Sequence, residues 1–150
     1  MESAGVASAP FAFSVQATAP GIFVFGDNRA VVQNVLPDSS LVVNTADTPV
    51  PAGDYIIAYL TGQGALDNPV ATGNIAGGAT LSVPKLPYSA KLGDKPVTVA
   101  FLGMTPGQIA LAQANILVPP DMLPGTYPLV ITIGGVPSNG PQITVTTKRP

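Results

Sequence analysis

Proline and glycine recur along the whole chain and divide it into short apolar segments. The 150 residues include 17 prolines and 16 glycines, and 46% of the residues are hydrophobic. Disordered chains combine low hydrophobicity with high net charge, whereas here only 9% of the residues are charged and the formal net charge is −2. Frequent turn residues in an apolar sequence therefore predict one folded domain of many short strands joined by tight turns.

Alternating or apolar runs mark the expected strands. We expect the most apolar run, 54–61, at the centre of a sheet, and a hairpin made of 30–35 and 41–43 around the turn residues between them. About eight or nine strands with turns every 8 to 12 residues predict an all-β fold, an immunoglobulin-like β-sandwich. The expected strands are 11–16, 22–25, 30–35, 41–43, 54–61, 96–102, 112–118, 126–133 and 142–147.

The segment from 105 to 118 has two interpretations. Residues 105–108 form a capping box with proline at the first helical position, and good helix formers follow. As a strand, the same segment places Gln113 and Asn115 together on one face. We predict one helical turn near 105–110, followed by a strand over 112–118.

Domain organisation follows from the same runs. We expect a flexible segment over 1–9, one domain over 10–147 and a tail over 148–150. The stretch 62–79 contains no clear strand. A loop of that length in a compact domain predicts either a functional surface or short strands that the sequence hides.

The absence of histidine and cysteine excludes several kinds of active site. A Ser-His-Asp triad, a Cys-His dyad, a histidine zinc site, an iron–sulfur site and a disulfide all require residues that this chain lacks. The seven aspartates lie beside glycine, proline or asparagine, or in other turn-like stretches, where their side chains bond their own backbone. We therefore predict that the protein is not an enzyme and has no cofactor.

Nucleic-acid binding and membrane insertion are also not expected. Six basic residues, two of them in the last three positions, do not form the basic stripe that phosphate contacts require. The longest apolar run, 55–60, is far shorter than the roughly 20 residues of a membrane span. The first residues lack the charged and apolar regions of a signal peptide.

Two pairs of side chains are candidates for an interaction surface. Gln113 and Asn115 project together from one expected strand, either as a hydrogen-bonding surface for a partner or as an ordinary solvated face. Tyr55 and Tyr59 lie four residues apart on another strand, where planar rings could stack on sugars. With few aromatic residues in the chain, core packing of at least one of these tyrosines is favoured.

Two further chemistries have weaker signals. An intramolecular Lys–Asn isopeptide bond would need a lysine, one of Lys85, Lys91 and Lys95, beside Asn34, Asn44 or Asn115, and these lysines lie in stretches that look exposed. Calcium could be held by oxygen ligands at residues 27–28 or 67–68, but neither pair has the spacing of a known calcium loop. We expect turns at both pairs.

Several segments follow one another in a recognisable order and spacing. They are APGIF (19–23), VNT (43–45), PAGDYIIAYLTGQG (51–64), PVATG (69–73), VTVAFLGMTPG (97–107), QANILVP (113–119) and LPGTYPLVITIGGV (123–136). This ordered set resembles a known family, the Solibacter C-terminal domain of secreted acidobacterial proteins. The resemblance covers roughly residues 15 to 147 and departs from the family pattern at Leu111 and Ala112, where an aromatic residue is usual. It implies a secreted or cell-surface module, often the last domain of a larger protein, and it brings no catalytic residue.

Together these observations predict a non-catalytic extracellular module that binds through sheet edges and loops. Its expected partners are proteins, neighbouring domains of the same exported chain or further copies of itself. Two alternatives remain open: a carbohydrate-binding module that uses the 62–79 loop and the tyrosines, and an accessory domain of a secreted hydrolase.

Overall fold

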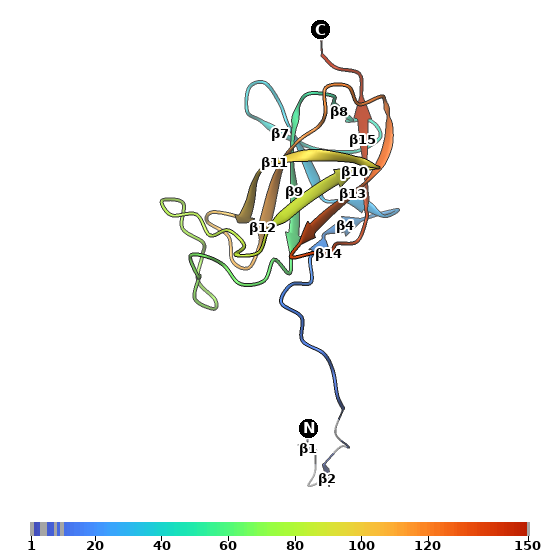
Figure 1. The fold of residues 1–150 in the computed structure, drawn as a ribbon. Helices are drawn as coiled ribbons and strands as arrows, with labels where there is room; N and C mark the ends of the chain where they lie inside the picture. Colours follow the sequence, from blue (N-terminus) through green and yellow to red (C-terminus); the bar gives the residue numbers. More distant parts are fainter. Residues whose placement is uncertain (1, 4–5, 8, 10, 150) are drawn as a thin grey trace.

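The computed structural model describes residues 2–3, 6–7, 9 and 11–149, and its regular structure there is entirely β (Figure 1). The all-β prediction is confirmed. The described residues contain no helix that is long and apolar enough to cross a membrane. The strands are β1 (Glu2–Ser3), β2 (Val6–Ala7), β3 (Gly21–Ile22), β4 (Val24–Phe25), β5 (Arg29–Ala30), β6 (Val32–Val35), β7 (Leu41–Val43), β8 (Val50–Pro51), β9 (Tyr55–Thr61), β10 (Tyr88–Leu92), β11 (Lys95–Met104), β12 (Ala112–Leu117), β13 (Gly125–Ile133), β14 (Val136–Pro137) and β15 (Gln142–Thr146).

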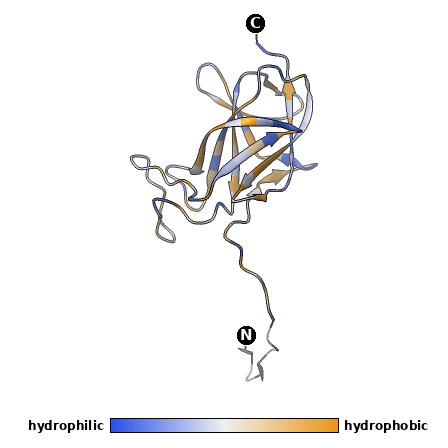
Figure 2. Cartoon of the chain, in the orientation of Figure 1, coloured by the Kyte–Doolittle hydropathy of each residue, from blue (hydrophilic) through white to orange (hydrophobic). Residues whose placement is uncertain are grey.

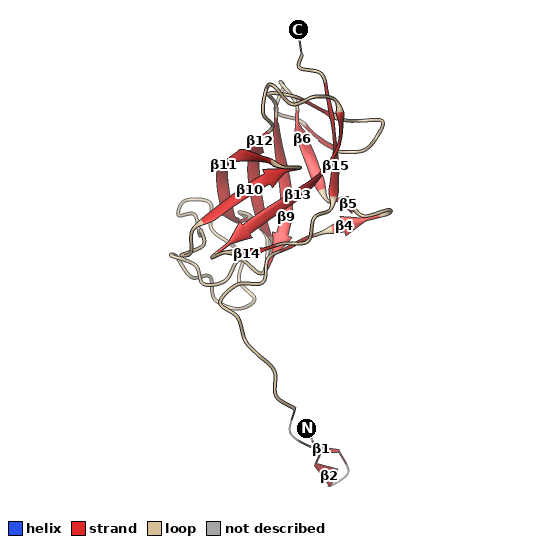
Figure 3. Ribbon diagram, turned by 45° about the vertical axis from the view of Figure 1, so that its right-hand side comes forward, coloured by secondary structure: helices blue, strands red, loops and turns tan. Residues whose placement is uncertain are grey.

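All strands except β1 and β2 belong to one curled sheet with the order β4-β5-β15-β13-β10-β11-β12-β9-β6-β7. We call β7-β6-β9-β12-β11 the first half-sheet and β11-β10-β13-β15, with β4, β5 and β8, the second half-sheet. β11 belongs to both, because its start pairs with β10 and its later part pairs with β12. In Figures 1 and 3, β10 and β13 cross in front of β9, so the curl brings the two halves face to face.

An alternating pattern on each half-sheet fills the space between them. Along β9 and β12, every second residue is fully buried, while the residues between are partly exposed. β9 lies between β12 and β6, which confirms its predicted central position. The largest fully buried side chains come from both halves: Ile56, Leu60, Leu92, Leu102, Ile116, Leu129, Ile131, Ile133, Ile143, Val32, Val50 and Val118.

A β-bulge lets β11 pass from one half-sheet to the other. Val99 lies opposite Ile116 and Phe101 lies opposite Asn115, so Ala100 is an extra residue without its own partner. The extra residue reverses the alternation, because Val99 packs against the core while Phe101 shares the face of Asn115. Bulges bend a strand and increase its twist, which is what a shared strand of a curled sheet needs.

Asparagine side chains close the sheet on the side opposite β11. Asn44 is buried; its Nδ2 donates to the Thr144 carbonyl (2.9 Å), and its Oδ1 accepts from the Thr144 N–H (2.8 Å). Asn139 bonds Ile22 in the same way: its Nδ2 donates to the Ile22 carbonyl (2.9 Å), and its Oδ1 accepts from the Ile22 N–H (2.7 Å). Each carboxamide therefore replaces the backbone of a neighbouring strand, across 100 residues of sequence for Asn44 and 117 for Asn139. We call the region joined by these two side chains the seam.

The predicted helical turn near 105–110 is wrong. The backbone there forms the loop of a hairpin between β11 and β12, closed by a hydrogen bond from the Thr105 N–H to the Leu111 carbonyl (2.8 Å). Gly107 has a φ of +76° and Ala110 a φ of +55°. Both values are left-handed and interrupt a right-handed helix.

Several strand predictions need correction. Residues 11–16 form no strand and extend away from the sheet, although they alternate as a strand would. β10 was not predicted, because Pro84, Pro87 and two lysines made its surroundings look like a loop. The expected hairpin is confirmed, since β6 pairs antiparallel with β7. The 62–79 stretch contains no strand among its described residues and adds only isolated bridges at Leu66 and Ala76.

Candidate interaction surface

The side of the first half-sheet that faces away from the core gathers the four side chains proposed from the sequence. We call this side the outer face. Tyr59 lies directly opposite Gln113, Asn115 lies opposite Ile57, and Tyr55 starts the same strand. Because directly opposite residues share one face of a sheet, Tyr55, Tyr59, Gln113 and Asn115 lie together on two neighbouring strands.

Core packing of Tyr55 or Tyr59 was the favoured expectation, and it is wrong. The residues that alternate with them, Ile56, Ala58 and Leu60, fill the core instead. Tyr55 is 43% exposed at the start of β9, while Tyr59 is half-buried among its neighbours on the outer face. Tyr88 and Tyr127 are the tyrosines that pack against the core, and both are partly buried.

Neutral hydrogen bonds organise the polar side chains of the outer face. The Tyr59 hydroxyl donates to Gln33 Oε1 on β6 (2.7 Å), and Gln113 Nε2 donates to Asn115 Oδ1 along β12 (3.1 Å). Burial raises the pKa of Tyr59, so this phenol stays protonated to a higher pH than a free tyrosine. The result is a surface of fixed amide and phenol groups set among apolar side chains.

At one end of the outer face, an apolar hollow of about 290 Å³ lies beside Tyr59. Backbone bonds build it: the Phe23 N–H donates to the Tyr59 carbonyl (3.0 Å), and the Val31 N–H donates to the Phe23 carbonyl (2.7 Å). None of the described residues that line it is charged. The lining residues are Phe23, Val31, Val32, Gln33, Val43, Tyr59 and Leu111.

Sequence reasoning missed the hollow. Phe23 lies in an apolar run, 22–25, that reads as an ordinary buried strand, yet Phe23, Val24 and Phe25 are 43%, 49% and 38% exposed. The run breaks into β3 and β4, which pair with different strands, and the break turns Phe23 outward. A run of consecutive apolar residues without alternation was the available signal.

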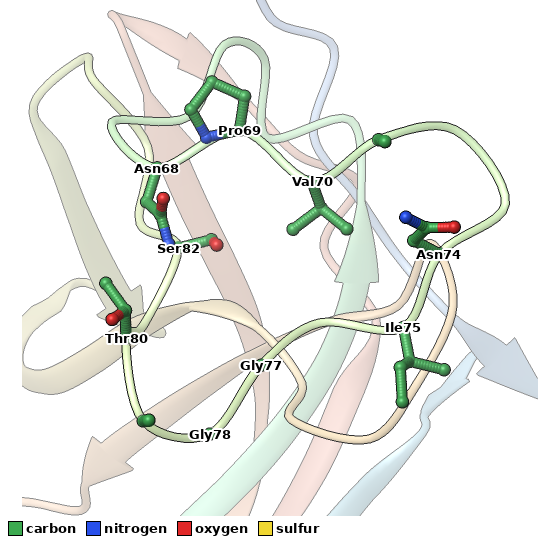
Figure 4. A pocket seen from close by; sticks show the side chains of 11 residues that line it. Asn68, Pro69, Val70, Asn74, Ile75, Gly77, Gly78, Thr80 and Ser82 are labelled. Carbon is green, nitrogen blue, oxygen red and sulfur yellow. The ribbon is translucent and has the colours of Figure 1, made fainter.

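The long loop encloses a second and larger pocket of about 550 Å³ (Figure 4). Its wall is uncharged and includes the side chains of Asn68, Asn74, Thr80 and Ser82. Ser82 is 2% exposed, and within the described residues its hydroxyl has no hydrogen-bond partner. In Figure 4, Ser82 and Val70 point into the space that the loop encloses. The Ser82 hydroxyl thus lies buried in the wall of the pocket, where the described residues leave it unsatisfied.

The asparagines proposed for an isopeptide bond, and Lys95, have other partners. Asn34 and Asn44 are buried and bond each other, with Asn44 Nδ2 donating to Asn34 Oδ1 (2.9 Å). Asn34 Nδ2 donates to the Thr48 carbonyl (2.9 Å), and the Lys95 ammonium pairs with Asp121 (2.8 Å). These contacts explain the buried asparagines as parts of the fold.

The residues proposed for calcium binding lie in turns. The Asp67 carboxylate accepts from the N–H groups of Asn68 (2.6 Å) and Val83 (2.9 Å), and Asn28 has a φ of +57°. Across the described part of the chain, there is no group of three or more histidine, cysteine, aspartate or glutamate side chains that could hold a metal ion.

No protein-family model, curated protein or solved structure matches this chain.

Proposed function

We propose that the protein is a non-catalytic interaction module that binds a protein partner on the outer face of its first half-sheet. The observation that carries this proposal is the outer face itself, where uncharged amides, exposed tyrosine and apolar side chains lie on neighbouring strands beside an apolar hollow. Interface cores are poor in charged residues and rich in aromatic ones, which is the composition of this face. The resemblance to the Solibacter C-terminal domain supports a secreted or cell-surface location.

The fold that we propose for this module is immunoglobulin-like. Taking β6, β9, β10, β11, β12, β13 and β15 as strands A to G, the first half-sheet has the order A-B-E-D and the second has the order C-F-G. These are the two sheet orders of immunoglobulin constant-type domains. β5 and β8 pair in parallel with β15 and directly precede β6 and β9 in the chain, so they join the two sheets as a curled form requires.

Site-specific photo-crosslinking tests the proposed surface. A photoreactive residue replaces Ile57, in the middle of the outer face, or Ser89, an exposed position on β10 of the second half-sheet, and each protein is exposed to an extract of the source organism. We expect protein adducts at position 57 and none at position 89. Equal labelling at both positions, or none at position 57, would show that the outer face is not the binding surface.

A second candidate function is binding of a neutral saccharide in the loop pocket. The buried Ser82 hydroxyl, to which the described residues supply no partner, favours it, because an uncharged pocket with hydroxyl and amide groups matches the hydrogen-bonding groups of a sugar. Such binding would also suit an accessory domain of a secreted hydrolase. Glycan-array binding that falls on Ser82→Ala assigns it to the pocket, whereas a loss on Tyr59→Ala assigns it to the outer face. An array without signal removes this candidate.

A further inference from the structure

A short segment before the sheet carries three large apolar side chains in contact with solvent. We call residues 11–16 the arm. Phe11, Phe13 and Val15 alternate along it and are 87%, 78% and 85% exposed. Figure 1 shows this part of the chain running out from the sheet, and Figure 2 shows hydrophobic residues along it. An extended segment with one apolar side has the side-chain pattern of a strand that lacks a sheet.

Backbone contacts direct the arm away from the body. β3 pairs antiparallel with the end of β9, and the Ala19 N–H continues this pairing to the Gly62 carbonyl (2.9 Å). The Ala17 carbonyl then lies against Gly64, and the Thr18 hydroxyl donates to the Ile133 carbonyl (2.9 Å). The chain before β3 therefore runs past the end of β9 and away from Tyr59 and the hollow.

The hollow on the outer face has the complementary properties. It is apolar, and β7 beside it is the edge of the sheet, with Leu41 and Val43 each 45% exposed. An edge strand presents backbone groups that a further strand can bond, and on β7 one of them, the Val43 carbonyl, already accepts a hydrogen bond from the Thr48 hydroxyl (2.6 Å). The arm has six residues and an extended length of about 20 Å, so it can cover β7 and reach the hollow with its aromatic side chains.

We propose that the arm of one copy binds as an added strand beside β7 of a second copy, with its phenylalanines in the apolar hollow. The inference rests on the proposed function, because it names the partner of the outer face. A second copy is the occupant that the structure supports, since this chain carries both the exposed apolar strand and the exposed apolar receiver, and the path of the arm leads away from its own hollow. The contact is head-to-tail, so it can repeat from copy to copy.

The size of the contact sets its strength. Aromatic side chains bury about 150–250 Å² each, so one arm can bury on the order of 500 Å². Stable interfaces bury about 800 Å² on each partner. We therefore expect weak assembly that grows with protein concentration.

Sedimentation velocity of the full chain tests the proposal. The wild-type protein is compared with two variants. Phe13→Asp places a charge on the apolar side of the arm, and Val43→Asp places a charge in the apolar hollow. Leu123→Asp is the matched control, because Leu123 is 73% exposed and belongs to neither part. We expect the wild type and the control to assemble as concentration rises, and each of the other variants to assemble at least tenfold more weakly. Circular dichroism confirms that every variant is folded.

Mixing the two defective variants gives the sharpest result. Phe13→Asp keeps an intact hollow and Val43→Asp keeps an intact arm, so an equimolar mixture should form a dimer that cannot extend. A wild type that stays monomeric, a Phe13→Asp variant that assembles normally, or a mixture that stays monomeric would each overturn the inference. If Phe13 were shielded from solvent in a monomeric protein, the arm would fold back on its own chain, which would also overturn the inference. Crosslinks from position 57 to a different protein would then leave the proposed function standing without this inference.

Discussion

At the seam, the Asn44 side chain occupies the place of a strand backbone. It bonds both the N–H and the carbonyl of Thr144 and also the Asn34 side chain, and it is 1% exposed. A buried polar group that loses its partner costs about 1–3 kcal/mol. Removing the Asn44 amide leaves three such groups without partners: the N–H and the carbonyl of Thr144 on β15, and Asn34 Oδ1 on β6.

We expect Asn44→Ala to lower the free energy of unfolding by about 3 kcal/mol, because the buried Asn34 side chain and the partly buried Thr144 backbone lose their bonds. Urea unfolding followed by circular dichroism measures the change. Asn74→Ala is the control, since Asn74 is exposed in the long loop and its replacement should cost less than about 0.5 kcal/mol. Equal losses for the two variants would mean that the seam does not depend on Asn44.

Tyr59 gives a pH dependence whose direction can be derived. Burial raises its pKa above the ordinary value of 10.0, so the unfolded chain releases this proton at a lower pH than the folded chain does. The contribution of Tyr59 is therefore complete below the unfolded pKa and is lost as pH rises toward the folded pKa.

For Tyr59→Phe, we expect a loss of about 1 kcal/mol near pH 8, from the missing bond to Gln33, and a smaller loss as pH rises through about 10. Urea unfolding of both proteins between pH 8 and pH 11 measures the difference, and the other tyrosines cancel in the comparison. A difference that stays constant over this range would contradict the pKa direction.

Among the elements, β3 and the segment before it depend on glycines at the end of β9. A Cβ on Gly62 would meet the Ala19 carbonyl, and Gly62 has a φ of +77°. A side chain there would combine backbone strain with a direct clash. Gly73 has nearly the same φ, +81°, with nothing within 4 Å of the added atom.

Alanine substitutions at Gly62 and Gly73 therefore separate the cost of backbone strain from the cost of a steric clash. We expect Gly73→Ala to cost about 1 kcal/mol, from the left-handed backbone alone, and Gly62→Ala to cost about 3 kcal/mol. Thermal unfolding of the two variants supplies the measurement. Similar shifts in both would show that β3 moves aside without cost.

The strands differ in how far their sequences determine them. Along β9, β12 and β13, local alternation agrees with the final burial, so their existence and inward faces were predictable. In β10, alternation over five residues was obscured by neighbouring prolines and lysines. Residues 11–16 alternate equally well but pair with no strand among the described residues, because pairing depends on distant parts of the chain. The turn at 105–110 had helical propensity that the β11–β12 hairpin overrode.

The same reasoning explains the candidate surface. Period-two alternation predicts that Gln113 shares a face with Asn115, and Tyr55 with Tyr59. Their meeting on one face required the register between β9 and β12, which a single sequence does not contain. The hollow depends on three segments that meet only in the folded sheet, near Phe23, Val43 and Leu111.

For the whole molecule, the seam keeps the curled sheet closed together with the parallel pairing of β15 with β5 and β8. Asn139 holds β3 through both backbone groups of Ile22, whereas β9 and β12 are held by full strand pairing on both sides. Closure at β3 should therefore be lost more easily than the centre of the first half-sheet.

We expect Asn139→Ala to speed amide hydrogen exchange in residues 18–25 by about tenfold or more, with exchange in β9 and β12 unchanged. Hydrogen exchange followed by mass spectrometry measures both regions in one experiment. Faster exchange throughout the sheet would instead mean that Asn139 supports global stability, and unchanged exchange near β3 would mean that other contacts hold the strand.

The two seam asparagines also determine which solution conditions the closed sheet tolerates. Carboxamides neither gain nor lose a proton at ordinary pH, and they are insensitive to the redox potential that governs disulfides. The ion pairs Lys95–Asp121 and Arg149–Asp54 lie at the surface, where such pairs contribute little. The contribution of these asparagines to the stability of the closed sheet should consequently change little with pH, salt or reductant. The same changes would open a sheet that was held closed by carboxylate ion pairs or by disulfides.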